Sequence, residues 1–282
     1  MKKIIILLGL CLLTSTSVMA SNCEYSCVEP YDTNGKFTTF ISNITGLNFA
    51  QTKISEAVLK KSILKTVKGD KNLKVDIESY SAKDLKNGIF KSLSVSGENV
   101  VIEDIYLSSL ELKSICDFNY VQYDKKGNLK FKEDFPMTFN IKMNSDDINN
   151  TMKSEKYKKV VNDVNKLGLG GIKVASTTAS IRGNKFYYAL NIEIPFIKRE
   201  QKVEISADIN VKNGKIDFDN TRLASNSFNL DLKRFDFLMD YLNPLDFSVN
   251  IFNDKDAKIY IKNIAIKNNI IVTDGTVVVP KD

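Results

Sequence analysis

The feature that most constrains the fold is a pair of segments in which apolar and polar residues alternate over a long stretch. Every second residue from Phe186 to Phe196 is apolar, and the same holds from Val203 to Val211. Successive side chains of a β-strand point to opposite faces of the sheet, so this period predicts two strands that each have one apolar face. The Asn213-Gly214 dipeptide that follows is typical of a type I′ hairpin turn and predicts a third strand.

The length of these strands indicates the shape of the sheet. At about 3.4 Å per residue they exceed about 30 Å, whereas most strands of globular proteins have about five or six residues. Long antiparallel strands with one apolar face favour a sheet that curls around other elements. Shorter alternating or apolar segments predict further strands at residues 73–77, 89–95, 100–112, 116–123, 137–143, 259–261 and 270–279.

Three helices are expected among these strands. Apolar residues recur at helical spacing over residues 52–68, 145–167 and 229–242. Ser145 is a suitable N-cap for the second helix, and Pro244 closes the third, which has apolar residues on two sides. Because no linker interrupts residues 49–282, we expect one α+β domain, in which a long curved antiparallel sheet wraps one or more amphipathic helices.

The first twenty residues have the pattern of a secretory signal peptide. Two lysines precede an apolar run from Ile4 to Leu13, and Val18-Met19-Ala20 provides the small residues of a cleavage site. The run is about half the roughly 20 apolar residues that cross a bilayer. We expect cleavage after Ala20, export to the periplasm or cell envelope, and a mature chain of 282 − 20 = 262 residues that has no transmembrane helix. Residues 21–48 then form a cysteine-containing lead-in.

The composition argues against several classes of function. The chain has no histidine, which excludes Ser-His-Asp and Cys-His catalysis and histidine metal sites. Its acidic pairs, at residues 103–104, 146–147 and 254–256, fit turns or a helix start and lack calcium-loop spacing. After cleavage the net charge is (40 − 2) − 34 = +4, which is mild for a nucleic-acid binder. We expect no catalytic residue, metal, cofactor or nucleic-acid partner.

Three cysteines remain after cleavage, and an oxidising compartment favours pairing of two of them. Cys23 and Cys27 are close enough in sequence to close a small loop, and either one can instead join the N-terminal segment to Cys116. The local pair of Cys23 and Cys27 is the expected disulfide.

The apolar face of the long strands has two interpretations. If a helix covers it closely, its residues form an ordinary core, which the sequence alone favours; if the helix stands off, they line a groove for an apolar ligand. The two-sided third helix raises the odds of an exposed ligand or membrane site. The candidate lipid-contacting residues are Phe186, Tyr188, Leu190, Ile192, Val203, Ile205, Ile209, Phe235, Leu238 and Leu242.

Several segments resemble the LmeA-like phospholipid-binding proteins. They are MNSDDINNTMKSEKYKKVV, KFYYALNIEIPF, QKVEISADINVKNGKIDF and the C-terminal part that begins FDFLMDYLNPLDFSVNIF. The resemblance covers roughly residues 49–280 and implies an exported protein similar to tubular lipid-binding folds, where a curved sheet wraps a long helix around an apolar groove. It carries no catalytic motif, and the lead-in of residues 21–48 departs from it.

The leading hypothesis is therefore a non-enzymatic lipid-binding protein of the cell envelope. It would sequester the acyl chains of a phospholipid or a related lipid in an apolar groove and contact a membrane surface. The alternative is a structural or interaction protein of the envelope with a filled core and no lipid ligand. A glycosidase-like enzyme ranks third, because it requires two carboxylates about 5 to 9.5 Å apart in one pocket.

Overall fold

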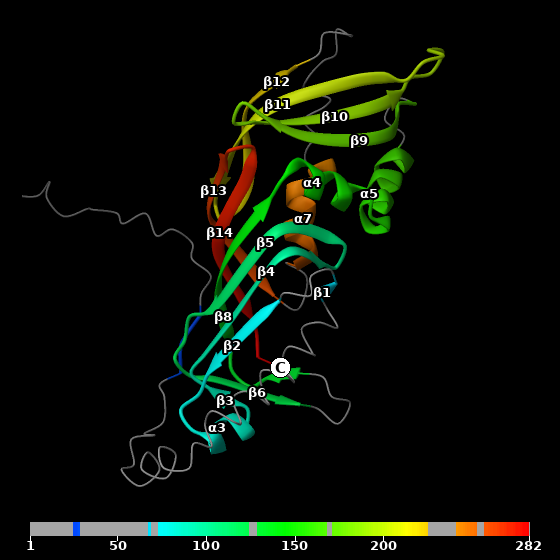
Figure 1. Cartoon of the computed structure of the whole chain (residues 1–282). Helices are drawn as coiled ribbons and strands as arrows, with labels where there is room; N and C mark the ends of the chain where they lie inside the picture. Colours follow the sequence, from blue (N-terminus) through cyan, green and yellow to red (C-terminus); the bar gives the residue numbers. More distant parts are fainter. Residues whose placement is uncertain are drawn as a thin grey trace, which may run out of the picture.

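The computed structural model describes residues 25–28, 67–68, 73–123, 129–167, 171–224, 241–252 and 257–281. These residues form three antiparallel sheets and a few short helices, so the predicted α+β class is confirmed, with β-structure dominant. Figure 1 shows the four-stranded sheet at one end of the molecule, the seven-stranded sheet along its middle, and the three-stranded sheet at the opposite end.

The seven-stranded sheet is built largely from hairpins. Its order is β1-β4-β5-β8-β14-β13, and β2 also pairs with β4. The strands are β1 (Val67–Lys68), β2 (Lys74–Glu78), β4 (Ser92–Ile102), β5 (Ile105–Ser114), β8 (Phe135–Met143), β13 (Lys258–Lys267) and β14 (Ile270–Val279). Because β14 pairs with β8, the C-terminal hairpin completes a sheet begun by the first half of the chain.

The four-stranded sheet contains the long alternating segments and has the order β12-β11-β10-β9. Its strands are β9 (Lys173–Arg182), β10 (Lys185–Glu193), β11 (Gln201–Lys212) and β12 (Lys215–Leu223). Asn213 and Gly214 both have positive φ, 53° and 74°, as a type I′ turn requires. Strand β9 was not predicted, because small and hydroxyl residues weaken its apolar alternation.

The first long strand is shorter than its alternation predicts. Strand β10 ends at Glu193, so the last two apolar residues of the pattern, Ile194 and Phe196, lie outside it. The reason is Pro195, which has no backbone N–H to continue a β-ladder and instead occupies a turn.

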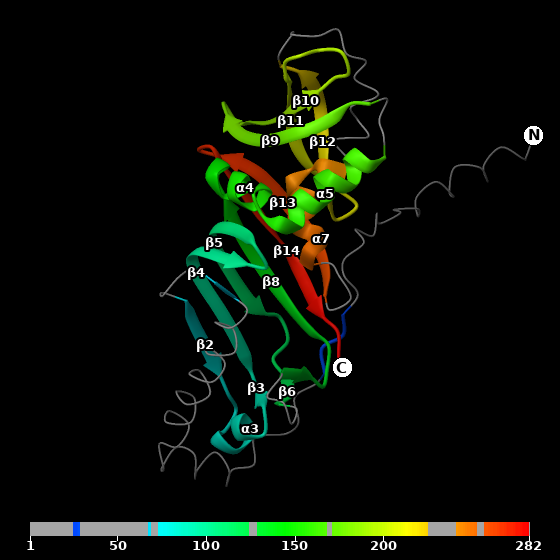
Figure 2. The same cartoon turned by 90° about the vertical axis from the view of Figure 1, so that its right-hand side faces the viewer.

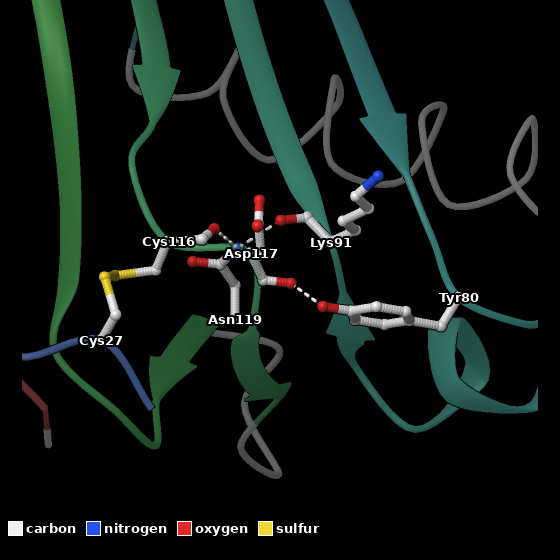
Figure 3. Close-up of a disulfide and its surroundings, with 6 residues drawn as sticks. All are labelled: Cys27, Tyr80, Lys91, Cys116, Asp117 and Asn119. Carbon is white, nitrogen blue, oxygen red and sulfur yellow. Dashed lines mark hydrogen bonds between the residues drawn. A yellow bond between two sulfur atoms is a disulfide. The ribbon is translucent and has the colours of Figure 1, made fainter. Parts of the chain in front are cut away.

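The three-stranded sheet lies at the end that carries the disulfide. It consists of β3 (Ile89–Phe90), β6 (Asn119–Tyr123) and β7 (Leu129–Phe131), with α3 (Ala82–Lys86) nearby. Cys27 is bonded to Cys116, with their Cα atoms 5.4 Å apart (Figure 3). The predicted local pair with Cys23 is therefore wrong, because Cys27 reaches the body of the protein. Cys23 and residues 1–20 lie outside the described part of the chain.

A break divides the helix predicted over residues 145–167. The two helices are α4 (Ser145–Met152) and α5 (Glu155–Lys166). Ser154 produces the break, because its side chain accepts a hydrogen bond from the backbone N–H of Tyr157 at 3.2 Å and so caps a new helix. The N-cap of α4 is Asn144, one residue before the predicted Ser145, and it forms a capping box with Asp147.

The other two predicted helices fall mostly outside the described residues. Of residues 52–68, Val67 and Lys68 are described, and they form β1 because they pair with β4. Of residues 229–242, Tyr241 and Leu242 are described and are helical.

Pro244 opens a helix that was not predicted, α7 (Pro244–Phe252). Asn243 caps it by accepting a hydrogen bond from the backbone N–H of Leu245 at 3.0 Å, and the fixed φ of proline suits the first helical position. Asn-Pro followed by Asp246 was the available sequence signal, since an acidic residue is favoured in the first turn.

One apolar core joins the two larger sheets. It includes buried residues of β5, β10, β11 and β14 and of α4, α5 and α7, and the three helices lie where the sheets meet (Figure 2). The β11–β12 turn docks on β13, since the N–H of Ile261 donates to the carbonyl of Gly214 at 3.0 Å. A Cβ at Gly214 would lie 2.3 Å from the Tyr260 ring, so both this approach and the positive φ require glycine.

Candidate functional site

A pocket of about 210 Å³ lies between the seven-stranded sheet and α7. Strands β4, β5, β8, β13 and β14 supply most of its walls, β12 contributes Ile216, and α7 contributes Leu245 and Val249. Of the 20 residues that line it, only Ser248 and Thr273 have polar side chains. The pocket therefore offers an apolar surface from two sides.

Strand register explains why so many apolar side chains converge there. In the β5–β8 pair, Leu110 lies opposite Ile141 and Leu112 lies opposite Phe139, and all four residues line the pocket. Cross-strand partners share a face of the sheet, so the alternation of each strand adds up to a continuous apolar surface. Gly275, opposite Phe139 on β14, leaves room for the ring, since a Cβ there would lie 2.8 Å from it.

The polar groups of the pocket carry no charge. The hydroxyl of Ser248 donates to the carbonyl of Pro244 at 2.8 Å, so its hydrogen bond is made within α7. No Asp, Glu, Lys or Arg is among the described residues that line the pocket. Such walls favour hydrocarbon and disfavour charged groups, and they provide no acid or base for chemistry inside the pocket.

Two buried tyrosines, Tyr157 and Tyr188, lie next to the segment that leads into α7. The Tyr157 hydroxyl lies 2.6 Å from the carbonyl of Leu242, to which it donates, and 2.8 Å from the hydroxyl of Tyr188. The Tyr157 ring also packs edge-on against Phe247 of α7, with ring centroids 5.1 Å apart. Burial raises the pKa of Tyr157 to about 12 and raises that of Tyr188 as well, so both remain neutral near neutral pH. These contacts fix α7 at the pocket.

The candidate residues predicted from the sequence lie elsewhere in the same core. Phe186, Tyr188, Leu190, Ile192 and Leu242 are 0% exposed, Val203 and Ile205 are 2% exposed, and Ile209 is 8% exposed. None of these eight residues lines the apolar pocket, and Phe235 and Leu238 fall outside the described residues. The structure brings the eight residues together in a closely covered core between the four-stranded sheet and the helices.

Most of the pocket residues on the seven-stranded sheet were predicted as strand positions but not as a site, and those on α7 were not predicted. Apolar and polar residues alternate at residues 137–143 and 270–279. This pattern predicts an apolar face of a strand, but it does not distinguish a filled core from a pocket wall. The missing element was α7, whose capping signal at Asn243 and Pro244 would have placed a second apolar surface opposite the sheet.

A second cleft, of about 640 Å³, lies between α4, α5 and β9 and has a mixed lining that includes apolar residues such as Met152 and Val161. Asp146, Lys153 and Lys158 line it together with several Asn, Ser and Thr residues. Lys158 is already paired with Glu155 at 2.7 Å. Charges of both signs exposed to water do not define a ligand class, so the apolar pocket is the stronger candidate site despite its smaller volume.

Comparisons with protein-family models, with curated proteins and with solved structures find no match for the chain. Among the described residues, no helix is long and apolar enough to span a membrane, and no group of three or more Asp, Glu or Cys residues is placed to hold a metal ion. The pocket and the molecular surface are therefore the observations from which function is argued.

Proposed function

We propose that the protein is an exported, non-enzymatic lipid-binding protein of the cell envelope that holds acyl chains in the pocket beneath α7. The observation that carries this proposal is the pocket itself, whose lining includes 18 apolar residues out of 20. Supporting it, the signal-like segment at residues 1–20 predicts export, and the sequence resembles the LmeA-like phospholipid-binding proteins. Under this proposal the seven-stranded sheet and α7 correspond to the curved sheet and helix of a tubular lipid-binding fold.

Apolar burial would supply the affinity. Each methylene removed from water contributes about 0.8 kcal/mol, so about six methylenes in contact with the walls contribute about 5 kcal/mol before the cost of ordering the chain. A charged headgroup would remain outside, because the lining offers it no ionic partner.

Two substitutions of the same kind test the proposal. Ala257 lines the pocket, whereas Ala265, paired with Val272 on β14, lies outside it: the preceding pair of Ile264 and Thr273 lines the pocket, so Ala265 is on the opposite face of the hairpin. Ala257→Trp should fill the pocket, and Ala265→Trp adds the same bulk elsewhere. Lipid is extracted from the purified mature proteins and quantified by mass spectrometry.

We expect phospholipid to accompany the wild-type protein and Ala265→Trp, and to fall about tenfold in Ala257→Trp, which corresponds to about two lost methylene contacts. Equal lipid in both variants would place the ligand outside this pocket. A wild-type protein that carries no lipid, takes none up from liposomes and instead recovers a stoichiometric envelope protein would favour the alternative of an interaction protein.

A further inference from the structure

The turn between β10 and β11 presents an aromatic side chain in an unusual way. The N–H of Ile197 donates to the carbonyl of Ile194 at 3.1 Å, which closes a four-residue turn around Pro195 and Phe196. Phe196 has φ of 71°. Proline followed by a residue of positive φ defines a type II turn, in which the third position normally belongs to glycine or asparagine. A phenylalanine in this conformation is strained, and its side chain is 105% exposed, so burial within the chain does not explain it.

The turn is held firmly at its base. Gly171, just before β9, also has positive φ, 83°, and a Cβ there would lie 2.7 Å from Cγ of Pro195. At the same end of the sheet, the side chain of Asn165 donates to the carbonyl of Val174 and accepts from its N–H, at 3.0 and 2.7 Å. The C-terminal end of α5 and the turn therefore lie at one end of the four-stranded sheet, where β9 begins and β10 ends (Figure 1).

Exposed apolar side chains gather at this end of the sheet. Six large apolar side chains are exposed among the described residues, and three of them lie here: Leu167 at 59%, Phe196 at 105% and Ile197 at 37%. Single exposed apolar residues are ordinary, but a projecting group of them usually marks a surface that contacts something apolar.

Basic residues surround the same end of the sheet. Lys198 and Arg199 directly follow Ile197 and are exposed, and Lys166, Lys173 and Lys202 lie on the adjoining ends of α5, β9 and β11. Lys166 is paired with Asp163 at 2.8 Å, Lys202 lies 3.8 Å from Glu204, and Lys173 lies opposite Glu193 in the β9–β10 register. The cations next to the exposed apolar residues of the turn are therefore Lys198 and Arg199, which are followed by Glu200. We call Phe196 and Ile197 the apolar tip. Such a tip flanked by cations matches the two layers of an anionic membrane surface, where acyl chains lie beneath negative headgroups.

We propose that the β10–β11 turn docks the protein on anionic phospholipid bilayers, with Phe196 and Ile197 inserted among the lipids and Lys198 and Arg199 at the headgroups. This docking surface goes beyond the proposed pocket function, because it is a second lipid-contacting region in another part of the molecule. A protein partner would be the competing occupant, but the exposed tip is small and rimmed by charge, which fits a membrane interface better than a standard protein interface.

The best test variant is Phe196→Gly. Glycine is the residue that the turn prefers, so the variant should be at least as stable as the wild-type protein in thermal unfolding while it loses the apolar tip. Binding is measured by co-sedimentation with vesicles of equal parts phosphatidylglycerol and phosphatidylcholine. We expect Phe196→Gly and the double variant Lys198→Glu/Arg199→Glu each to weaken binding at least tenfold. Val28→Ser, which removes an exposed apolar side chain near the disulfide, should bind as the wild-type protein does.

A fluorescence measurement locates the inserted residue. The chain has no tryptophan, so Phe196→Trp gives a signal from the tip alone. Brominated acyl chains in the vesicles should quench it, and the emission should shift to shorter wavelength on binding. Unquenched emission, or vesicle binding that is unchanged in Phe196→Gly, would overturn the proposal. So would a wild-type protein that does not bind these vesicles and captures a protein through Phe196.

Vesicle binding by Ala257→Trp separates the two proposals, since docking should persist when the pocket is filled.

Discussion

The inner faces of the four-stranded and seven-stranded sheets are built from the same kinds of residue at the same spacing, yet they are covered differently. On the first, Phe186, Tyr188 and Leu190 are 0% exposed, and helices and neighbouring strands fill the space above them. On the second, Phe139 and Leu110 line the pocket, whose lining also includes Leu245 and Val249 of α7. An alternating pattern thus identifies an apolar face, and the covering element decides whether that face becomes a filled core or a binding site.

The largest difference between the two faces should come from a buried charge. Tyr188→Asp places a carboxylate among the core residues and removes the hydrogen bond to Tyr157, so we expect a loss of at least about 4 kcal/mol or a failure to fold. Tyr187→Asp changes the opposite face of the same strand, where the Arg182 guanidinium lies 3.9 Å from the ring centroid, and should cost about 1 kcal/mol. Urea denaturation measures both, and similar losses would contradict a filled core.

Truncating a leucine on each face should sharpen the comparison. Leu190→Ala should cost about 3 to 5 kcal/mol, because it leaves a cavity in close packing. Leu110→Ala should cost about 2 kcal/mol, since part of the removed surface already faces free space. The two leucines are 0% and 3% exposed, so solvent exposure alone does not predict a difference. Equal losses of unfolding free energy in the two variants would indicate that the pocket is closed in solution.

Removing the disulfide should lower stability while leaving the pocket intact. The bond between Cys27 and Cys116 closes a loop with a sequence separation of 89, and losing such a constraint costs about 2 to 4 kcal/mol. Around Cys116, the Asn119 amide donates to the carbonyls of Lys91 and Cys116 at 2.9 Å (Figure 3), and none of these three residues lines the pocket. A Cys27→Ala/Cys116→Ala double variant should therefore unfold at lower urea concentration and still retain lipid. As the control, a reducing agent should not change the stability of this double variant, because it has no Cys27–Cys116 bond to lose.

The tyrosine pair that connects the filled face to α7 predicts a smaller, pH-dependent effect. The pKa of Tyr157 is about 12 in the folded protein against an ordinary value of 10.0, so the unfolded chain loses this proton first. Its contribution to stability is complete below pH 10 and is lost as the pH rises toward 12, to a limit of about 2.7 kcal/mol. The alkaline loss should be smaller by that amount in Tyr157→Phe. Parallel pH profiles for the two proteins would contradict this role.

The sequence predicts much of the β-structure because period two is a local property. The hairpin at Asn213-Gly214 and the alternation of β10 and β11 could be read directly, since each depends on neighbouring residues. The covering of a face is not local. Whether Phe139 lines a pocket or belongs to a filled core depends on α7, whose residues are more than 100 positions away in the chain. The pairing of β14 with β8 joins residues that are also more than 100 positions apart in sequence.

Other differences between the predicted and the observed elements have a local cause in the sequence. Pro195 ends β10 and moves Phe196 from the predicted apolar face to an exposed turn. Ser154 divides one predicted helix into two, and Asn243 with Pro244 starts a helix at a position interpreted as an end. In each case a capping or turn residue prevailed over the apolar periodicity around it.

The difference between the two faces can be measured with single tryptophans, because the natural chain has none. Phe139→Trp reports on the pocket and Phe186→Trp on the filled core, where the phenylalanine stacks on Phe218 with centroids 5.6 Å apart. The delipidated variants are loaded with a phospholipid brominated along its acyl chain, and fluorescence quenching is recorded. The account predicts strong quenching of Phe139→Trp and little of Phe186→Trp; equal quenching, or stronger quenching of Phe186→Trp, would contradict it.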